Sequence, residues 1–512
     1  MGSIARARQR ALRVVPAVVA AAALTGSSAV ALAGTASTAQ SAGPTIKLYA
    51  AQLHEQVGVF GRGASYIDPS IYVEALGQSL QFDVQRKNLS KPITITQILK
   101  TASGATERRT LPAWTLNHWN GLNKFIQVKV QNGAGKVLAS RYLTFCPDGN
   151  AQRATPDSPA KSPYPYECSS YTPFVLGTVW GIEKGWGVDP EDYDSVTAKL
   201  QLGKTYKVTM TITKPWQHIL HVSAKDATAA VKMKAVTPAE CNPCSFGRKA
   251  KPASRPATAA QQAATAAQMQ RVPLVTSPPE SVLPDLLPLP SWGISVQNGK
   301  AAAGKVAQSH VAFGATVSVL GNGPLDVEGF NTTHSAIMPA YQYFWRGSHL
   351  VGRARAGTMG FDNEHGHHHW HFEQFAQYRL LGKNKKTVVR SHKVGFCIAP
   401  TDAVNLLVPH ADWQPTYTGF TGECGAPGAL WVQEMMPLGW GDTYFQSVAG
   451  QTFNITNLPN GVYYIEIIAN PEHVLHETNL SNDISLRKII IGGTAGHRTV
   501  RVPAYHGIDP EN

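Results

Sequence analysis

Short segments in which hydrophobic and polar residues alternate recur along most of this 512-residue chain. Successive side chains of a β-strand point to opposite faces of the sheet, so this alternation predicts strands with one buried face. The clearest examples are residues 79–85, 125–131, 206–212, 311–320, 375–381, 451–458, 462–470 and 485–491. Gly, Asn, Asp and Pro separate the segments, which predicts a mainly β protein with antiparallel strands. Asn460 and Gly461, between two of the segments, also predict a β-hairpin.

A change of composition divides these predicted strands into two groups. Residues 245–280 are rich in Ala, Gln and Pro, which is typical of an interdomain linker, and residues 257–270 within it have good helix propensity. We predict two β-sandwich-like domains, at residues 34–244 and 281–495. A C-terminal tail would follow at residues 496–512.

The N-terminus predicts export. Residues 1–33 contain four arginines, then an apolar run, and end in Ala31-Leu32-Ala33, which together have the features of a secretory signal peptide. No later stretch is long and apolar enough to span a membrane. We therefore expect a secreted, extracellular protein, with the cell wall as a candidate location.

Export also permits disulfides. The chain has an even number of cysteines, for which fifteen pairings are possible, namely Cys146, Cys168, Cys241, Cys244, Cys397 and Cys424. Of these pairings we favour Cys397 with Cys424. Cys241 and Cys244 form a lone CxxC without a second pair at zinc-finger spacing, so a structural disulfide is favoured there over redox or zinc chemistry.

The charge balance indicates which partners to expect. The formal net charge is +13, and removal of the four signal arginines, Arg6, Arg8, Arg10 and Arg13, lowers it to +9. A basic surface favours an anionic partner such as a cell-wall polymer. The basic residues are dispersed and no recognition motif accompanies them, so we expect no nucleic-acid partner.

Residues 361–375, FDNEHGHHHWHFEQF, hold five of the 18 histidines. His367, His369 and His371 are spaced two residues apart, so on a strand they share one face, and imidazole is a good ligand for copper, zinc, iron and nickel. On a straight strand the first and third would stand about 13 Å apart, so either the strand bulges or two of these histidines join a ligand from elsewhere. The alternatives are an exposed tract with adventitious metal affinity and hydrogen-bonded core histidines.

The histidines belong to a series of motifs that resembles the lysyl oxidase family. The series comprises LPDL at 283–286, HHHWH at 367–371, F-x-x-Y-x-L-L at 375–381, HKVGFC at 392–397, DTY at 442–444 and NPEHVLHETNLSND at 470–483. These motifs occur in the family's order. The resemblance implies a lysyl oxidase-like catalytic domain in the C-terminal half and does not reach residues 34–280.

This resemblance also implies the roles of individual residues. His367, His369 and His371 would be copper ligands, and Lys393 and Tyr444 would be the precursors of lysine tyrosylquinone, the cofactor that the family makes from its own side chains. Such an enzyme uses O2 to convert primary amines, either peptidyl lysine or small amines, to aldehydes, with release of hydrogen peroxide and ammonia. Asp442 is our candidate for the general base, although a role as a turn or cap residue is equally compatible with its position.

Two other functions compete with this interpretation. In a zinc hydrolase the histidines would bind zinc and Glu364 or Glu373 would act as the base, but the sequence contains no HExxH motif. In a non-catalytic, metal-containing protein that binds the cell wall or matrix, Lys393 and Tyr444 would stay unmodified. A carbonyl reagent distinguishes that alternative from a quinone enzyme.

Overall fold

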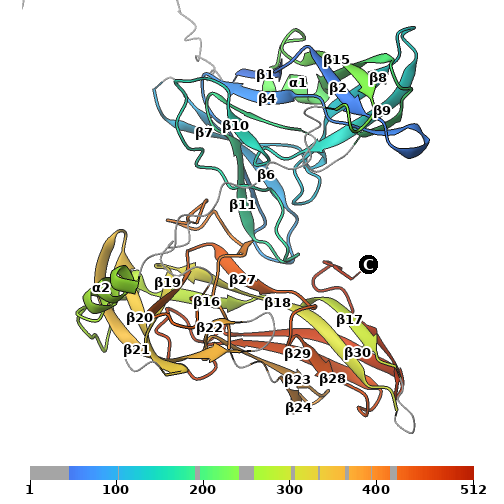
Figure 1. Ribbon diagram of the computed structural model, residues 1–512. Coiled ribbons are helices and arrows are strands. Elements are labelled where there is room, and N and C mark those ends of the chain that lie inside the picture. Colours follow the sequence, from blue (N-terminus) through green and yellow to red (C-terminus); the bar gives the residue numbers. More distant parts are fainter. Residues whose placement is uncertain are drawn as a thin grey trace, which may run out of the picture. The chain divides into compact units, whose positions relative to one another are not determined.

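The structure, a computed structural model, describes residues 45–101, 103–190, 196–241, 259–300, 306–331, 335–363, 368–391, 393, 395–415 and 424–511, except for the side chains of residues 62, 259, 261 and 262. Strands dominate these residues, so the predicted mainly β fold is confirmed (Figure 1). No helix among them is long and apolar enough to cross a membrane. The predicted signal peptide lies outside the described residues.

The strands of the N-terminal half form four sheets. The first two sheets have the strand orders β1 (Thr45–Ala50), β4 (Ile71–Leu76), β12 (Trp186–Val188), β10 (Ala151–Arg153) and β11 (Gly177–Ile182), β5 (Leu80–Gln85), β6 (Thr94–Lys100), β7 (Thr106–Thr110). The third sheet consists of β13 (Val196–Lys199) and β3 (Ala64–Ile67). The fourth has the strand order β2 (His54–Gly58), β15 (Thr228–Val236), β14 (Thr205–Ile212), β8 (Leu122–Gln131), β9 (Val137–Phe145). All pairings are antiparallel except that of β15 with β2. Helix α1 (Lys214–Leu220) follows β14, and short 3-10 helices lie at Gly61–Gly63 and Ala113–Thr115.

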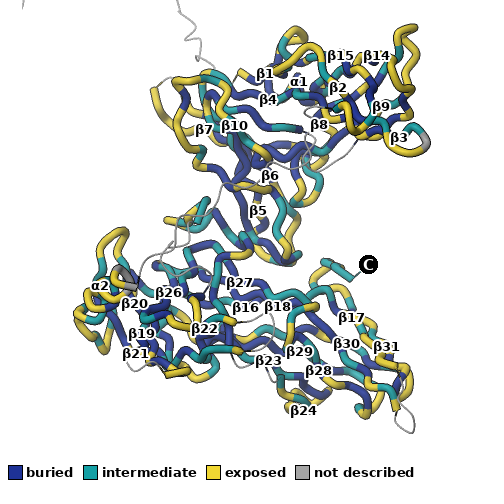
Figure 2. The backbone as a smooth tube through the Cα atoms, viewed as in Figure 1, coloured by how far each residue is buried: buried dark blue, intermediate teal, exposed yellow. Residues whose placement is uncertain are grey.

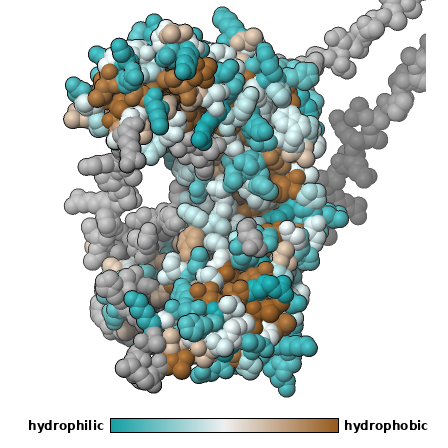
Figure 3. All heavy atoms as spheres, turned by 90° about the vertical axis from the view of Figure 1, so that its right-hand side faces the viewer, coloured by the Kyte–Doolittle hydropathy of each residue, from teal (hydrophilic) through white to brown (hydrophobic). Residues whose placement is uncertain are grey.

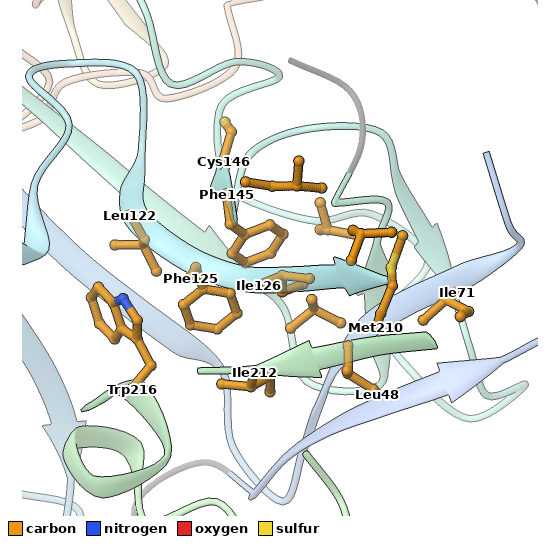
Figure 4. Packing of buried hydrophobic residues seen from close by; sticks show 14 of the residues in the cluster. Leu48, Ile71, Leu122, Phe125, Ile126, Phe145, Cys146, Met210, Ile212 and Trp216 are labelled. Atoms are coloured by element: carbon orange, nitrogen blue, oxygen red, sulfur yellow. The ribbon is translucent and has the colours of Figure 1, made fainter. Parts of the chain in front are cut away.

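An aromatic cluster anchors the core of this half. The ring of Phe125 stacks on Phe145, with centroids 4.8 Å apart, and meets Trp216 of α1 edge-on at 5.2 Å (Figure 4). The indole N–H of Trp216 donates to the carbonyl of Asn123 (2.8 Å), so its polar atom is satisfied although the ring is buried. Pro215 in the first turn of α1 favours the start of this helix.

The C-terminal half contains three further sheets. The first has the strand order β16 (Pro284–Pro288), β18 (Ser309–Gly321), β27 (Trp440–Tyr444), β25 (Asp402–Ala403), and β17 (Trp292–Asn298) and β28 (Thr452–Asn454) also pair with β18. The second has the strand order β22 (His369–Phe372), β21 (His349–Asp362), β20 (Ile337–Arg346), β19 (Leu325–Phe330), β26 (Trp431–Met436). The third has the strand order β24 (Thr387–Arg390), β23 (Ala376–Leu381), β29 (Gly461–Ala469), β30 (Ile484–Thr494), β31 (His497–Arg501). Buried segments of β18, β19 and β29 supply much of the core (Figure 2).

The hairpin predicted at Asn460 and Gly461 is wrong. The strand before these residues, β28, pairs with β18, whereas the strand after them, β29, pairs with β23 and β30. The guanidinium of Arg498 donates to the carbonyls of Thr456 (2.9 Å) and Leu458 (2.5 Å). These carbonyls are therefore bound by a side chain rather than by a neighbouring strand.

The Ala/Gln-rich segment, which has good helix propensity, contains helix α2 (Ala259–Met269). The segment after it packs on the C-terminal half, because Tyr343 donates its hydroxyl to the carbonyl of Met269 (3.0 Å). The guanidinium of Arg353 donates to the carbonyls of Gln270 (2.6 Å) and Val272 (3.0 Å). A 3-10 helix at Glu280–Val282 then leads into β16. The proposed domain boundaries themselves stay predictions.

Hydrogen bonds link the two halves near β25. The carbonyl of Val404 accepts the N–H of Leu176 (2.8 Å). The buried carboxylate of Asp402 accepts the N–H groups of Tyr171 (2.9 Å) and Thr172 (2.7 Å). Because β25 pairs with β27, these contacts reach the strand that carries Asp442 and Tyr444.

Candidate active site

Two histidines of the predicted metal motif face each other on β22. The strand pairs with the end of β21, where Asp362 lies opposite His369 and Gly360 opposite His371. Two residues apart on a strand, both imidazoles lie on one face, and their Nε2 atoms are 2.9 Å apart. His371 is buried and His369 is half-buried. The third predicted ligand, His367, lies outside the described residues.

This pair has a geometry that fits two ligands of one metal ion. Two nitrogens that each lie about 2.0–2.1 Å from an ion stand about 3 Å apart when their bonds meet near a right angle. Neutral imidazole nitrogens are suitable donors for copper. Within the described ranges no group of three His, Cys, Asp or Glu residues converges on one point. The copper site therefore stays a prediction, supported by the pair His369 and His371.

A carboxylate lies behind one of the two imidazoles. The Nδ1 atom of His371 is 3.5 Å from Oδ2 of Asp362, so the Nε2 atom is left for the face shared with His369. Carboxylates in this position orient metal-binding histidines and raise their basicity. Gly395 lies against the same ring, because a Cβ placed there would come within 2.6 Å of the His371 Cβ atom. Neither Asp362 nor Gly395 was identified as a site residue from the sequence.

The segment that carries Lys393 is fastened to β22. Phe396 and Phe372 exchange backbone hydrogen bonds (3.1 and 2.8 Å). The Nζ atom of Lys393 lies 4.4 Å from the ring centroid of Tyr444 and 4.8 Å from that of Phe396. Lys393 is buried, and this burial lowers the pKa of its amine, although the charge of Asp442 acts in the opposite direction.

Tyr444 is held by the backbone of Cys397. The phenol oxygen accepts the N–H of Cys397 (2.9 Å) and donates to its carbonyl (3.1 Å). Cys397 is disulfide-bonded to Cys424, as predicted, and the carbonyl of Cys424 accepts the N–H of Trp370 on β22. The disulfide therefore joins the segment that holds Tyr444 to the strand that carries the two histidines.

The other described cysteines are also disulfide-bonded. Cys146 bonds to Cys168, and Cys241 is disulfide-bonded, in agreement with the structural interpretation of the CxxC. Cys244 lies outside the described residues. None of the described cysteines is a free thiol.

Two buried carboxyls lie near Lys393 and Tyr444. Asp442 shares a face of β27 with Tyr444, and its Oδ2 atom has no hydrogen-bond partner among the described residues. Burial raises the pKa of Asp442 well above its usual range, while the charge of Lys393 lowers it. Glu434, which the sequence reasoning missed, accepts the N–H of Ile398 (3.0 Å), and burial raises its pKa well above the usual range as well.

The arrangement of these groups fits a cofactor made from Lys393 and Tyr444. An amine with a lowered pKa lies over a phenol ring whose own pKa is raised by burial and by the charge of Asp442. The ring is fixed at its hydroxyl by Cys397, so its orientation relative to the amine is defined. The structure brings together all three predicted catalytic residues, although their roles stay predictions.

The zinc-hydrolase alternative requires a general base, for which Glu364 and Glu373 are the candidates. The carboxylate of Glu373 accepts a hydrogen bond from the Thr358 hydroxyl (2.6 Å). Glu364 lies outside the described residues. The zinc alternative gains no support from Glu373, because this carboxylate is engaged by Thr358 on β21.

Comparison with known proteins identifies the domain around this cluster. Residues 353–498 match the family model described as lysyl oxidase. This part of the chain is a lysyl oxidase domain. The match confirms the resemblance inferred from the motifs and includes both histidines, Lys393, Asp442 and Tyr444.

Individual relatives of the lysyl oxidase domain cover a smaller part of the chain. Lysyl oxidase homolog 2 of Gallus gallus is 30% identical over 119 residues, which are 23% of this chain and 13% of that protein. The Homo sapiens protein of the same name gives the same figures. Lysyl oxidase homolog 4 of Bos taurus is 28% identical over 141 residues, or 27% of this chain and 17% of the relative. The likeness therefore concerns the domain and a minor part of each relative.

Proposed function

We propose that this protein is a secreted, copper- and quinone-dependent amine oxidase that converts primary amines to aldehydes with release of hydrogen peroxide and ammonia. Its substrates would be peptidyl lysine or small amines, together with O2. The observation that carries the proposal is the placement of the Lys393 amine 4.4 Å from the ring centroid of Tyr444, beside buried Asp442. The disulfides support an extracellular location.

The side chains of this site have separable tasks. A copper-dependent quinone derived from Lys393 and Tyr444 would supply an electrophilic carbonyl and accept the two electrons that leave the amine. His367, His369 and His371 would hold the copper, with Asp362 orienting His371. Burial of the Lys393 amine favours its neutral, nucleophilic form.

Asp442 has the properties of the base that removes a proton from the substrate. Its unpartnered Oδ2 atom is the site at which we place that proton. In the surrounding low-dielectric environment a protonated Asp442 is stable, as its raised pKa indicates. Glu434 and Cys397 position the backbone around the phenol oxygen, so their contribution is orientation rather than proton transfer.

A carbonyl reagent tests the proposal. After aerobic loading with copper, the protein should give a coloured adduct with phenylhydrazine, and a digest should yield one peptide that joins the segments of Lys393 and Tyr444. Lys393→Ala and Tyr444→Phe should each lose the adduct, the joined peptide and hydrogen peroxide production.

Matched variants control for general damage to the lysyl oxidase domain. Lys488→Ala removes an exposed lysine of β30, and Tyr463→Phe removes a hydroxyl that donates to the carbonyl of Pro459. Both should keep all three signals. Separate, unmodified Lys393 and Tyr444 peptides from copper-loaded protein would contradict the amine-oxidase proposal and favour the non-catalytic binding protein.

A further inference from the structure

The outer face of the sheet β2–β15–β14–β8–β9 concentrates positive charge. Along β14, Val208, Met210 and Ile212 point into the core, so the intervening residues point outward. The registers of the neighbouring strands then place four exposed lysines on the same outer face. We call this set the lysine face: Lys129, Lys207, Lys232 and Lys234.

The four lysines form a continuous stripe across three strands. Lys207 lies directly opposite Lys232, and Lys234 is two residues further along β15. Lys129 is the diagonal neighbour of Lys207, because Lys129 pairs with Thr209. Directly opposite residues have Cβ atoms about 4.5–5.5 Å apart, and diagonal neighbours about 7–8 Å, so each ammonium is near the next.

Opposing lysines in a sheet reduce stability, because like charges that face each other repel. No Asp or Glu occupies an outward position in the described residues of these five strands; the other outward residues include His54, Gln56, Gln127, Gln131, Val137, Ser140, Tyr142, Thr205, Thr209, Thr211, Thr228 and Ala230. Glu240, beyond the end of β15, is near enough to Lys234 for their charges to interact. The central pair Lys207 and Lys232 therefore has no acidic neighbour on this face.

We propose that the lysine face binds a linear phosphodiester polymer. A polymer with one negative charge per repeat offers successive anions to a stripe of successive ammonium groups, which relieves their mutual repulsion. Lysine binds phosphate as a point charge and so tolerates different orientations of the oxygens. The outward Thr and Gln side chains add hydrogen-bond donors, among them the exposed Thr205 and Thr228.

Other polyanions fit the lysine face less well. Planar carboxylates pair best with the guanidinium fork of arginine, and no arginine occupies an outward position of the five described strands. Single-stranded nucleic acid also needs aromatic platforms on which bases stack. Tyr142 on β9 is the outward aromatic residue of these described strands. It lies in the cross-strand row formed by Thr228, Thr211, Gln127 and Tyr142, which contains no lysine.

Binding of poly(glycerol phosphate) to the full chain tests the inference. The double variant Lys207→Gln/Lys232→Gln should bind at least tenfold more weakly than the unchanged protein. For this variant the slope of log affinity against log salt concentration should be less negative by about two, because two fewer counterions are exchanged. Since the change removes an opposed pair of like charges, the variant should melt at the same temperature or higher.

A matched control separates the lysine face from net charge. Lys383→Gln/Lys386→Gln removes the same charge from the exposed loop before β24 and should change affinity less than twofold. Equal losses in both double variants would overturn the inference. Tighter binding of poly-glutamate or of a single-stranded oligodeoxynucleotide would overturn the choice of polymer. Both double variants should keep oxidase activity on a small amine, so failure here leaves the amine-oxidase proposal untouched.

Discussion

The N-terminal and C-terminal halves differ in how many carboxyls they bury and in where their lysines gather. In the N-terminal half, lysines line an outer sheet face, and the core cluster around Phe125 and Trp216 is apolar and aromatic. The described residues of this half include three buried carboxyls, Glu74, Asp83 and Asp148. In the C-terminal half the buried carboxyls are more numerous: Asp326, Glu328, Asp402, Glu434, Asp442, Glu466 and Asp483. Five of these, Glu328, Glu434, Asp442, Glu466 and Asp483, have at least one oxygen without a hydrogen-bond partner in the described part of the chain.

Buried carboxyls lower the stability of the fold, so their positions indicate where the chain retains ionisable groups for catalysis. A buried carboxyl destabilises a fold unless it is paired or kept protonated. In the C-terminal half two such groups, Glu434 and Asp442, lie beside a buried amine and a buried phenol. Perturbed groups that gather in this way mark functional sites. The exposed lysines of the N-terminal half remain hydrated, so they are suited to binding a ligand rather than to catalysis.

Copper binding gives the sharpest test of the inward-facing groups. The mature protein should bind about one copper per chain, and His369→Ala should remove most of it, because the Nε2 atoms of His369 and His371 converge. His54→Ala changes an exposed, outward-facing histidine on β2 and should leave the copper content unchanged. Metal analysis after dialysis measures both. Full copper retention by a triple substitution at His367, His369 and His371 would exclude the site.

The two disulfides with assigned partners allow a comparison at nearly equal loop length. Cys146–Cys168 spans 22 residues and Cys397–Cys424 spans 27. Replacement of either pair by serines should lower the free energy of unfolding by about 2–4 kcal/mol, measured by urea denaturation. Only the loss of Cys397–Cys424 should also reduce formation of the phenylhydrazine adduct, because Cys397 holds the phenol of Tyr444. An equal effect of both pairs on the adduct would remove the functional distinction between the halves.

Local sequence patterns predicted much of this structure. Segments such as 206–212 and 485–491 form strands because alternation has the period of the sheet, and the spacing of His369 and His371 placed them on one face. Motifs of a known family drew attention to Lys393 and Tyr444. No local pattern would have selected these two residues.

Tertiary contacts explain what the sequence did not predict. Glu434 and Asp362 have no distinctive flanking residues, and they gain significance only because β26 and β21 bring them to Ile398 and His371. The false hairpin at Asn460 has a similar cause. Its turn residues are suitable, but Arg498, distant in sequence, binds the carbonyls before the turn.

Asp402 gives the smallest expected effect and tests the cost of a buried carboxyl directly. Burial raises its pKa to about 6, although the N–H groups of Thr172 and Tyr171 and the Thr443 hydroxyl favour its charged form. Because the pKa of Asp402 is higher in the folded protein than in the unfolded chain, the folded protein binds this proton more tightly than the unfolded chain does. The contribution of Asp402 to the free energy of unfolding should therefore fall as pH rises from about 4 to 6 and stay low above that range.

Substitution of Asp402 isolates this contribution. Asp402→Asn should be less stable at low pH, because it loses an acceptor for the N-terminal half, but the difference from the unchanged protein should shrink by about 2 kcal/mol between pH 4 and 6.5. Urea denaturation across that range measures the difference. Thr110→Ala, an exposed change on β7 that removes no titratable group, should give a difference that is constant with pH. A constant difference for Asp402→Asn as well would show that this carboxyl titrates as in water, and that its burial between the halves carries no electrostatic cost.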